Sequence, residues 1–281
     1  YVEENYVQLL GKALRENFCD DVRLQYRVVT DKEHGIGTTM ASEPETDGMP
    51  TGGVKPRTLA RQTQPVQQPQ PVEFDSQLNP TQTFDNYIEG VCNKLPRSVG
   101  MSIAEHPNTM QFNPMFIYGP SGCGKTHLIN AIGVKTTQIY PQKRVLYVSA
   151  RLFQVQYTNA VLQNAVNDFI AFYQTIDMLI VDDIQEWATA SKTLDTFFHI
   201  FNHLFRNRKQ IILASDRPPV DLVGMKDRLL TRFSCGLIAE LEKPNIALCV
   251  DILNSKCCRD GLKIPEDVIR YIAGTANGSV R

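Results

Sequence analysis

The stretch from Gly119 to Thr126 constrains this chain more than any other part of its sequence. It reads GPSGCGKT and matches the pattern GxxxxGK[ST] in full. The apolar run 115–118 precedes it, and the apolar pattern of 127–132 is typical of a helix. A strand before the loop and a helix after it are the context that this pattern requires. The sequence therefore predicts a strand–loop–helix unit whose loop binds phosphate groups.

Each residue type in this loop has a physical reason to be there. The glycines Gly119, Gly122 and Gly124 allow the backbone to curl so that several N–H groups point at phosphate oxygens, and the following helix adds its positive end. Lys125 would neutralise the charge of β- and γ-phosphates, and the Thr126 hydroxyl would hold Mg²⁺. The predicted ligand is a nucleoside triphosphate with Mg²⁺.

Two carboxylates follow a second apolar run, at residues 178–181. We expect Asp182 to bind the metal, directly or through water, and Asp183 to orient or deprotonate the attacking water. Asp216 follows the apolar run 211–214, where it would lie between the acidic pair and the γ-phosphate. The alternative for all three is an ordinary polar strand end, which for Asp216 would form a turn before two prolines.

Five apolar runs of strand length are separated by helical patterns, which predicts an α/β fold with a mostly parallel sheet and crossover helices. The expected strands cover residues 115–118, 145–148, 178–181, 211–214 and 236–241. After them the pattern predicts a helix over 246–257, a turn at Gly261 and a helix over 265–273. We therefore predict a nucleotide-binding core at 79–242 and a partial helical lid at 243–281.

The region before the core divides into two parts. Between residues 31 and 80 lie seven of the 16 prolines, a Gln/Pro tract and one aromatic residue, Phe74. Such a segment buries too little apolar surface to offset its ordering entropy, so we predict a flexible linker at 31–78. Residues 1–30 contain one amphipathic helical pattern and one alternating strand pattern. These two patterns predict the end of a small α/β domain.

Composition excludes several classes of protein. Lys and Arg number 29 against 30 Asp and Glu, so any contact with nucleic acid must come from a local patch. No apolar run approaches the roughly 18 residues that a membrane span needs. The seven cysteines form no CxxC pair, which favours reduced thiols and a cytoplasmic protein over a disulfide framework or a zinc site.

From about Leu78 to the last residue, the chain resembles the ATPase domain of the DnaA family, which are bacterial chromosomal replication initiators of the AAA+ class. The matching motifs are LNP at 78–80, TFDNY at 83–87 with Gly90, NPMFIYG at 113–119, DDIQ at 182–185, FFHIFN at 197–202, SDRPP at 215–219, DRLLTRF at 227–233 and SVR at 279–281. The resemblance implies a three-layer AAA+ fold around a parallel sheet. It also implies ATP as the nucleotide, with slow hydrolysis as the off switch.

The resemblance also assigns residues to roles around that nucleotide. The segment 84–93, which begins at Phe84 and ends at Asn93, would lie over the adenine and ribose. Asp216 matches a sensor residue, and Arg281 matches the lid arginine that contacts phosphate within one subunit.

Two arginines match positions at the subunit interface of the family. Arg232 matches the arginine finger, which reaches the γ-phosphate bound by a neighbouring subunit, and Arg228 would lie one turn earlier at the same interface. On a helix, this spacing of four places both side chains on one face. A planar, permanently charged guanidinium suits recognition of a terminal phosphate. The alternative is two ordinary surface salt bridges.

The partners implied by the resemblance are further copies of the chain and origin DNA. Thr158 and Lys192 match positions that contact single-stranded DNA, although an amphipathic helix with a solvated lysine is a plain alternative. Duplex origin DNA would be read by a domain that follows residue 281 in the family, so we expect the chain as given to lack that activity. The N-terminal domain would dock the replicative helicase, and acidic phospholipids are a further expected partner.

Two other functions fit the same motifs. One is a related helicase loader or initiator regulator, which would share the ATPase core without binding an origin. The other is a non-hydrolysing module in which the nucleotide only supports assembly.

Overall fold

The computed structural model describes residues 74–107, 110–276 and 278–279. The predicted N-terminal remnant at 1–30, most of the predicted linker and Arg281 lie outside the described residues.

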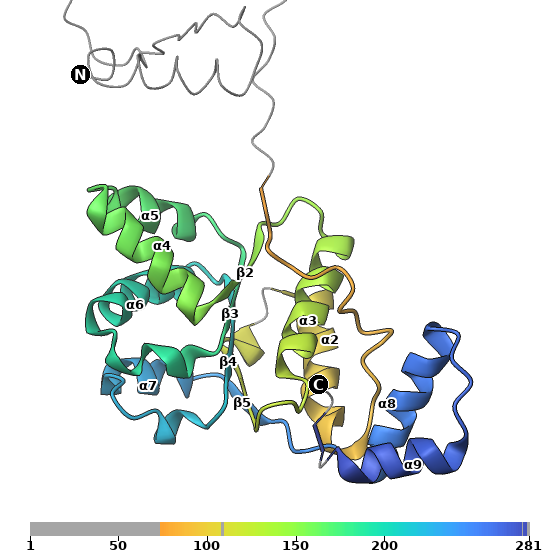
Figure 1. The fold of residues 1–281 in the computed structure, drawn as a ribbon. Coiled ribbons are helices and arrows are strands. Elements are labelled where there is room, and N and C mark those ends of the chain that lie inside the picture. The colour runs from red at the N-terminus through yellow and green to blue at the C-terminus, as the bar shows by residue number, and fades with distance from the viewer. Residues whose placement is uncertain (1–73, 108–109, 277, 280–281) are drawn as a thin grey trace, which may run out of the picture. The chain divides into compact units, whose positions relative to one another are not determined.

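A five-stranded parallel sheet forms the centre of the described region (Figure 1). Its strand order is β2-β3-β4-β1-β5. The strands are β1 (Met115–Tyr118), β2 (Val145–Ser149), β3 (Met178–Asp182), β4 (Gln210–Ser215) and β5 (Leu237–Glu240). The predicted strands and their parallel arrangement are confirmed. Because parallel strands end at the same edge, the phosphate loop after β1, Asp182 at the end of β3 and Asp216 after β4 meet there.

Helices cover both faces of the sheet (Figure 1). The helices are α2 (Lys94–Glu105), α3 (Lys125–Ile139), α4 (Ala150–Leu162), α5 (Val166–Gln174), α6 (Ser191–Arg206), α7 (Asp227–Phe233), α8 (Ile246–Arg259) and α9 (Glu266–Thr275), with short 3₁₀ turns η1 (Val91–Asn93), η2 (Met110–Phe112), η3 (Ile184–Thr189) and η4 (Pro219–Asp221). Helices α2 and α3 lie on one face, and α4 to α7 lie on the other (Figure 1). The result is the three-layer arrangement that the resemblance implied.

The strand side chains alternate between two hydrophobic cores. On β4, Ile211 and Leu213 belong to the core beneath α4 to α7, whereas Ile212 and Ala214 belong to the core beneath α2 and α3. This alternation follows from the two-residue period of a strand. Every residue of β3 and β4 is buried, because helices cover both faces of the sheet.

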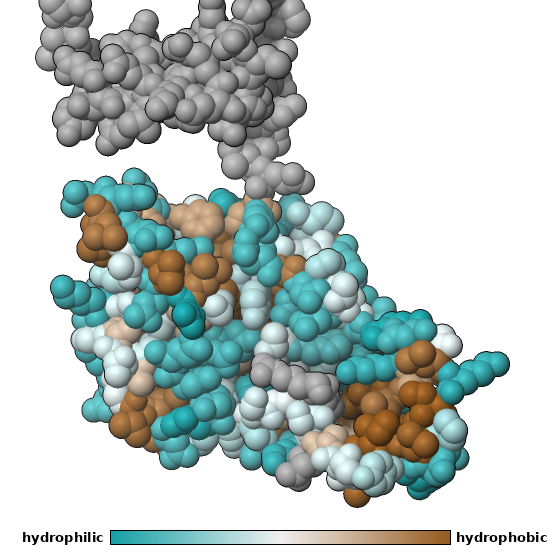
Figure 2. All heavy atoms as spheres, in the orientation of Figure 1, coloured by the Kyte–Doolittle hydropathy of each residue, from teal (hydrophilic) through white to brown (hydrophobic). Residues whose placement is uncertain are grey.

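The last two helices form a separate pair beside the core (Figure 1), and apolar side chains gather on the visible face of this pair (Figure 2). The Asn245 side chain caps α8 by accepting a 2.9 Å hydrogen bond from the Leu248 N–H. Gly261 takes a positive φ of 68° in the turn between α8 and α9. The two helices predicted on either side of the Gly261 turn are confirmed. Helix α8 ends at Arg259, two residues later than predicted.

Contacts with the core begin earlier than the predicted boundary at residue 78. The Tyr147 N–H of β2 donates a 2.9 Å hydrogen bond to the Ser76 carbonyl. The Arg144 guanidinium lies 4.7 Å from the centre of the Phe74 ring. Residues 74–78, predicted as linker, therefore pack on the edge of the sheet. Within the described residues, no helix is both long and apolar enough to cross a bilayer.

Candidate nucleotide-binding site

The phosphate loop curls tightly at the end of β1. Gly122 and Gly124 have φ angles of +83° and +99°. Positive φ angles of this size favour glycine, because glycine has no Cβ atom to clash with the backbone. A Cβ atom on Gly119 would lie 2.1 Å from the Leu241 carbonyl oxygen, so the loop approaches the chain after β5 too closely for any side chain there. A Cβ on Gly122 would lie 2.5 Å from Ser279 Oγ, which places Ser279 directly over the loop.

Lys125 lies within the curl of this loop. Its side chain is only 8% exposed, and its ammonium donates hydrogen bonds to the carbonyls of Gly119 (2.7 Å) and Pro120 (3.1 Å). A buried ammonium at the first residue of α3 makes the mouth of the loop positive, as the positive end of the helix also does. This fits a phosphate-binding loop.

Beside the loop, the Thr126 hydroxyl donates a 2.7 Å hydrogen bond to Asp182 Oδ2. The Tyr147 hydroxyl donates to the same oxygen over 3.1 Å. Asp182 is 2% exposed, and burial raises its pKa, an effect that the hydrogen bond from Thr126 opposes and the neighbouring Asp183 charge reinforces. Burial also raises the pKa of Tyr147, so this phenol stays protonated and can donate.

A hydroxyl and a carboxylate at this position suit a hard cation such as Mg²⁺, which prefers oxygen ligands. Thr126 and Asp182 are the predicted metal ligands, and the structure brings them together. Among the described residues no cluster of three or more His, Cys, Asp or Glu side chains could hold a metal by itself. Phosphate oxygens and water would have to complete such a site.

Asp183 and Asp216 face a cavity of about 540 Å³ at the carboxyl edge of the sheet. We call it the loop cavity. Its lining residues are Gln82, Ser121, Gly122, Gly124, Lys125, Thr126, His127, Asp183, Gln185, Glu186, Asp216 and Lys256. Asp183 and Asp216 therefore lie beside the phosphate loop, as the sequence predicts.

Gln185 links these two carboxylate residues. Its Nε2 donates to Asp183 Oδ1 over 3.0 Å, and its Oε1 accepts from the Asp216 N–H over 3.2 Å. Arg217 donates two 2.8 Å hydrogen bonds to the Asp216 carboxylate, and these lower the pKa of Asp216. Asp216 is therefore ionised at neutral pH.

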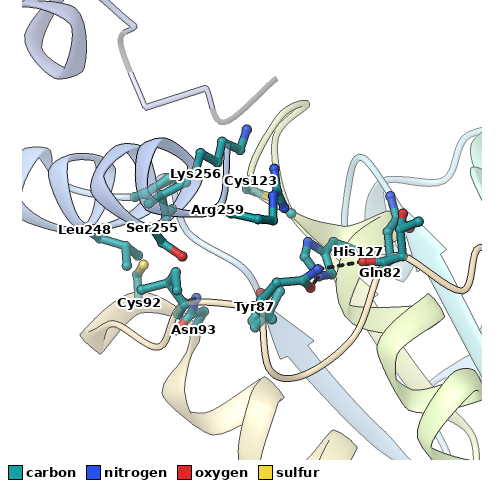
Figure 3. Close-up of a pocket in the computed structure, with 16 residues that line it drawn as sticks. Gln82, Tyr87, Cys92, Asn93, Cys123, His127, Leu248, Ser255, Lys256 and Arg259 are labelled. Carbon is teal, nitrogen blue, oxygen red and sulfur yellow. Dashed lines mark hydrogen bonds between the residues drawn. The ribbon is translucent and has the colours of Figure 1, made fainter. Parts of the chain in front are cut away.

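A second cavity, of about 220 Å³, adjoins the first one. Figure 3 shows this second cavity in close-up. We call it the lid cavity because helix α8 forms one of its walls. Its lining residues are Thr81, Gln82, Asn86, Tyr87, Ile88, Cys92, Asn93, Cys123, Gly124, His127, Pro244, Leu248, Ile252, Ser255, Lys256 and Arg259. Gln82, Gly124, His127 and Lys256 line both cavities, so the two meet at these residues. The apolar side chains among the walls suit a flat aromatic group such as a purine base.

The segment 84–93, predicted to lie over the adenine and ribose, contributes five residues to this cavity: Asn86, Tyr87, Ile88, Cys92 and Asn93. Asn93 is held by two hydrogen bonds. Its Oδ1 accepts a 2.7 Å hydrogen bond from the Gly90 N–H and its Nδ2 donates to the Ile88 carbonyl over 2.9 Å, so it shapes the wall. Phe84 does not line the lid cavity. Its ring is 5% exposed and packs in the core beneath α2 and α3, with Arg97 lying 5.7 Å from the ring centre. The predicted contact of Phe84 with the nucleotide is therefore corrected to a role in packing.

His127 is a site residue that sequence reasoning missed. Its Nε2 lies 3.0 Å from the Thr83 carbonyl and 2.8 Å from Asn86 Oδ1, and because both partners are acceptors we assign the proton to this nitrogen. Its ring meets the Tyr87 ring edge to face, with 5.1 Å between centres. Burial lowers the pKa of His127, which favours the neutral ring. His127 thereby ties the segment 83–87 to the phosphate loop.

Arg228 and Arg232 lie on α7, where both contact side chains of α6. Arg228 pairs with Asp195 and lies 4.2 Å from the centre of the Phe198 ring. Arg232 lies 5.9 Å from the centre of the Phe205 ring. Neither arginine lines the loop cavity of its own chain. The surface ion pair weighed as an alternative is present for Arg228.

Thr158 and Lys192 line one groove of about 420 Å³, although they belong to different helices, α4 and α6. The remaining lining residues are Gln154, Tyr157, Val161, Thr189, Ala190, Ser191 and Thr193. The structure therefore brings together the two predicted contacts with single-stranded DNA.

The strand order identifies the class of protein. β4 separates the strand of the phosphate loop from the strand of the acidic pair, as in the AAA+ ATPases. A family model described as the bacterial DnaA ATPase domain matches residues 78–240. The chain belongs to the DnaA family.

Individual relatives agree with this assignment. The chromosomal replication initiator protein DnaA of Bacteroides fragilis is 51% identical over 282 residues, which cover 100% of this chain and 59% of the relative. The crystal structure of domain III of Thermotoga maritima DnaA is 34% identical, with a TM-score of 0.70, and covers 73% of this chain and 85% of that one. A DnaA structure bound to AMPPCP and single-stranded DNA is 36% identical, with a TM-score of 0.67, and covers 72% of this chain and 62% of the other. The chain thus spans about three fifths of the length of the curated relatives that it matches.

Proposed function

We propose that this chain is the nucleotide-switched core of a bacterial chromosomal replication initiator. It binds ATP with Mg²⁺, the ATP-bound form self-associates on origin DNA and promotes strand opening, and slow hydrolysis turns the assembly off. The observation that carries the proposal is the contact between Thr126 and Asp182 beside the phosphate loop. Relatives named as replication initiators, which align with the whole chain, favour this function over a helicase loader or an initiator regulator.

Nucleotide binding follows from the two adjoining cavities. The lid cavity takes the adenine, with Asn93 shaping its wall, and the loop cavity takes the phosphates. Gly119, Gly122 and Gly124 expose backbone N–H groups to the phosphates, and Lys125 neutralises their charge.

Thr126 and Asp182 would hold Mg²⁺, which when bound neutralises charge that builds up on the phosphates. Asp183 orients the attacking water, and Asp216 lies at the same cavity as a sensor of the γ-phosphate. These two carboxylates favour a hydrolysing switch over a module in which the nucleotide is only structural. Arg281 would contact phosphate from the lid of the same subunit.

The arginines of α7 act on a neighbouring copy of the chain. Neither lines its own loop cavity, and the Arg232 guanidinium offers a planar, permanently charged group for a terminal phosphate. ATP supplies that phosphate and ADP does not, so the nucleotide state controls assembly. Arg228 lies one turn earlier, at the same interface.

Single-stranded DNA binds across the groove shared by Thr158 and Lys192. Lys192 supplies a charge for the phosphate backbone, and Thr158 a hydroxyl. The relative that was solved with single-stranded DNA supports this part of the proposal.

The remaining partners follow from the family alone. In the bacterial cytoplasm, duplex origin DNA would be read by a further domain, the replicative helicase would dock on the N-terminal domain, and acidic phospholipids would act on the nucleotide state.

Sedimentation velocity of the chain with ATP or ADP tests the proposed switch. We expect larger assemblies with ATP only, and Arg232→Ala should bind ATP normally but stay monomeric. Arg270→Ala, which removes an exposed arginine from α9, is the matched control and should assemble as the wild type does. ATP-dependent assembly that survives Arg232→Ala would refute the role of this arginine between subunits.

A further inference from the structure

One face of helix α8 forms a wall of the lid cavity. Leu248, Ile252, Ser255, Lys256 and Arg259 recur at helical spacing and all line that cavity (Figure 3). The face is apolar in its first half and polar or charged in its second half. The apolar half is anchored to the core, because the Leu248 side chain packs so closely on Gly90 that a Cβ there would lie 2.6 Å from it. The charged half lines the same cavity as Gly124 of the phosphate loop.

Among these five residues of α8, only Lys256 also lines the loop cavity. It stands with Gln82, Gly124 and His127 at the boundary between the two cavities. A nucleotide with its base in the lid cavity and its phosphates in the loop cavity must cross this boundary at the ribose and the first phosphate.

The walls of the loop cavity carry charges of both signs. Three carboxylates come from Asp183, Glu186 and Asp216. These groups would repel a polyphosphate, and Lys125 on the same walls reduces that repulsion, as Arg217 does by pairing with Asp216. Lys256 brings a second ammonium to the same walls from α8.

We infer that Lys256 of α8 contacts the α-phosphate of the bound nucleotide. The inference rests on the proposed function, since it assumes an adenine nucleotide in the two cavities. An ammonium on a flexible stem carries three donors and suits contact with a single phosphate, here the one next to the ribose. A guanidinium suits recognition through two parallel hydrogen bonds. Because every adenine nucleotide carries an α-phosphate, Lys256 increases affinity for ATP, ADP and AMP alike and does not read the γ-phosphate.

Binding measurements on the full chain test this role. Affinities for ATP and ADP are measured by calorimetry, and those for AMP and adenosine by displacement of a fluorescent ADP analogue. Lys256→Met keeps the apolar stem and removes the charge. It should weaken ATP, ADP and AMP by about tenfold each, the size of one charge-assisted hydrogen bond, and leave adenosine unchanged. Lys256→Arg should stay within about twofold of the wild type because it keeps the charge. Circular dichroism and thermal melting check that each variant is folded.

Lys263→Met is the matched control, because Lys263 is exposed beyond the end of α8 and lines neither cavity. It should leave all four affinities unchanged. Equal affinities of wild type and Lys256→Met for ATP, ADP and AMP would overturn the inference and leave the proposed function intact. An equal loss for adenosine, or a loss for ATP alone, would also overturn it, since the first indicates packing and the second a γ-phosphate contact. Failure of the wild-type chain to bind any adenine nucleotide would remove both the inference and the proposed function.

Discussion

Thr126 and Asp182 are separated by 56 positions in the sequence, yet the Thr126 hydroxyl lies 2.7 Å from the Asp182 carboxylate. The contact spans β4, because Thr126 follows β1 and Asp182 ends β3, and β4 lies between these strands. It joins the phosphate loop to the acidic pair.

The first prediction concerns Mg²⁺. Thr126→Val keeps the shape of the side chain but removes the hydroxyl, so one proposed metal ligand is lost. In the wild type, chelation of Mg²⁺ should weaken ATP binding by about tenfold or more, whereas in the variant it should change the affinity by less than about twofold. Calorimetric titrations with Mg²⁺ and with EDTA give both values.

Thr137→Val is the matched control for this prediction. Thr137 lies on the same helix, and its hydroxyl bonds to the Val134 carbonyl, away from the site. It should keep the full dependence on Mg²⁺. A Thr126→Val protein with the same dependence as the wild type would rule out this hydroxyl as a metal ligand.

The second prediction separates packing from binding at Phe84. Because the ring is buried in the core, Phe84→Leu should lower the free energy of unfolding by about 1–2 kcal/mol. ATP affinity at a temperature where the variant is folded should change by less than about twofold, since Phe84 does not line the lid cavity. Urea unfolding and calorimetry measure the two effects. A large loss of affinity with unchanged stability would restore Phe84 as a nucleotide contact.

Much of this architecture could be predicted from the sequence, because strands and loop residues carry local signals. The run 115–118 is β1, and Gly119–Thr126 can be recognised without any tertiary information. The order of the strands could not be derived from the residues, since nothing local indicates that β5 pairs with β1.

The residues of the site that were missed depend on contacts between distant segments. His127 acquires its role from partners at Thr83 and Asn86, more than forty positions away. Lys256 lines the loop cavity from α8, a helix that lies far from the phosphate loop in the sequence. Phe84 is assigned through the resemblance, as the first residue of the segment 84–93. A matching motif locates such a segment but does not give the direction of each side chain, and the Phe84 ring packs in the core.

The third prediction is a pH dependence of stability at Asp177. Its carboxylate accepts hydrogen bonds from the backbone N–H of Arg144 (2.9 Å) and from the Lys209 ammonium. Arg144, Asp177 and Lys209 directly precede β2, β3 and β4, so these bonds link the starts of the three strands. Burial tends to raise the pKa of Asp177, but the hydrogen bonds from Lys209 and Arg144 outweigh it and the pKa is lowered. The stabilisation is therefore full above the unfolded pKa of about 3.9 and is lost as pH falls through the lower folded value.

Asp177→Asn should lower the free energy of unfolding by about 1–2 kcal/mol at pH 7, and this difference from the wild type should shrink below about pH 4. Asp251→Asn, at an exposed position of α8, is the control and should match the wild type across the range. Thermal melts from pH 7 to pH 3 provide the comparison. A difference that stays constant over that range would show that the charge of Asp177 contributes nothing.

Calorimetric titration of ATP into wild-type chain and Lys125→Ala tests the nucleotide site most directly. Lys125 is the buried cation of the phosphate loop, so its removal should raise the Kd for ATP at least about a hundredfold, while a thermal melt shows the variant still folded. An ATP affinity of folded Lys125→Ala within about twofold of the wild-type value would contradict binding at this loop.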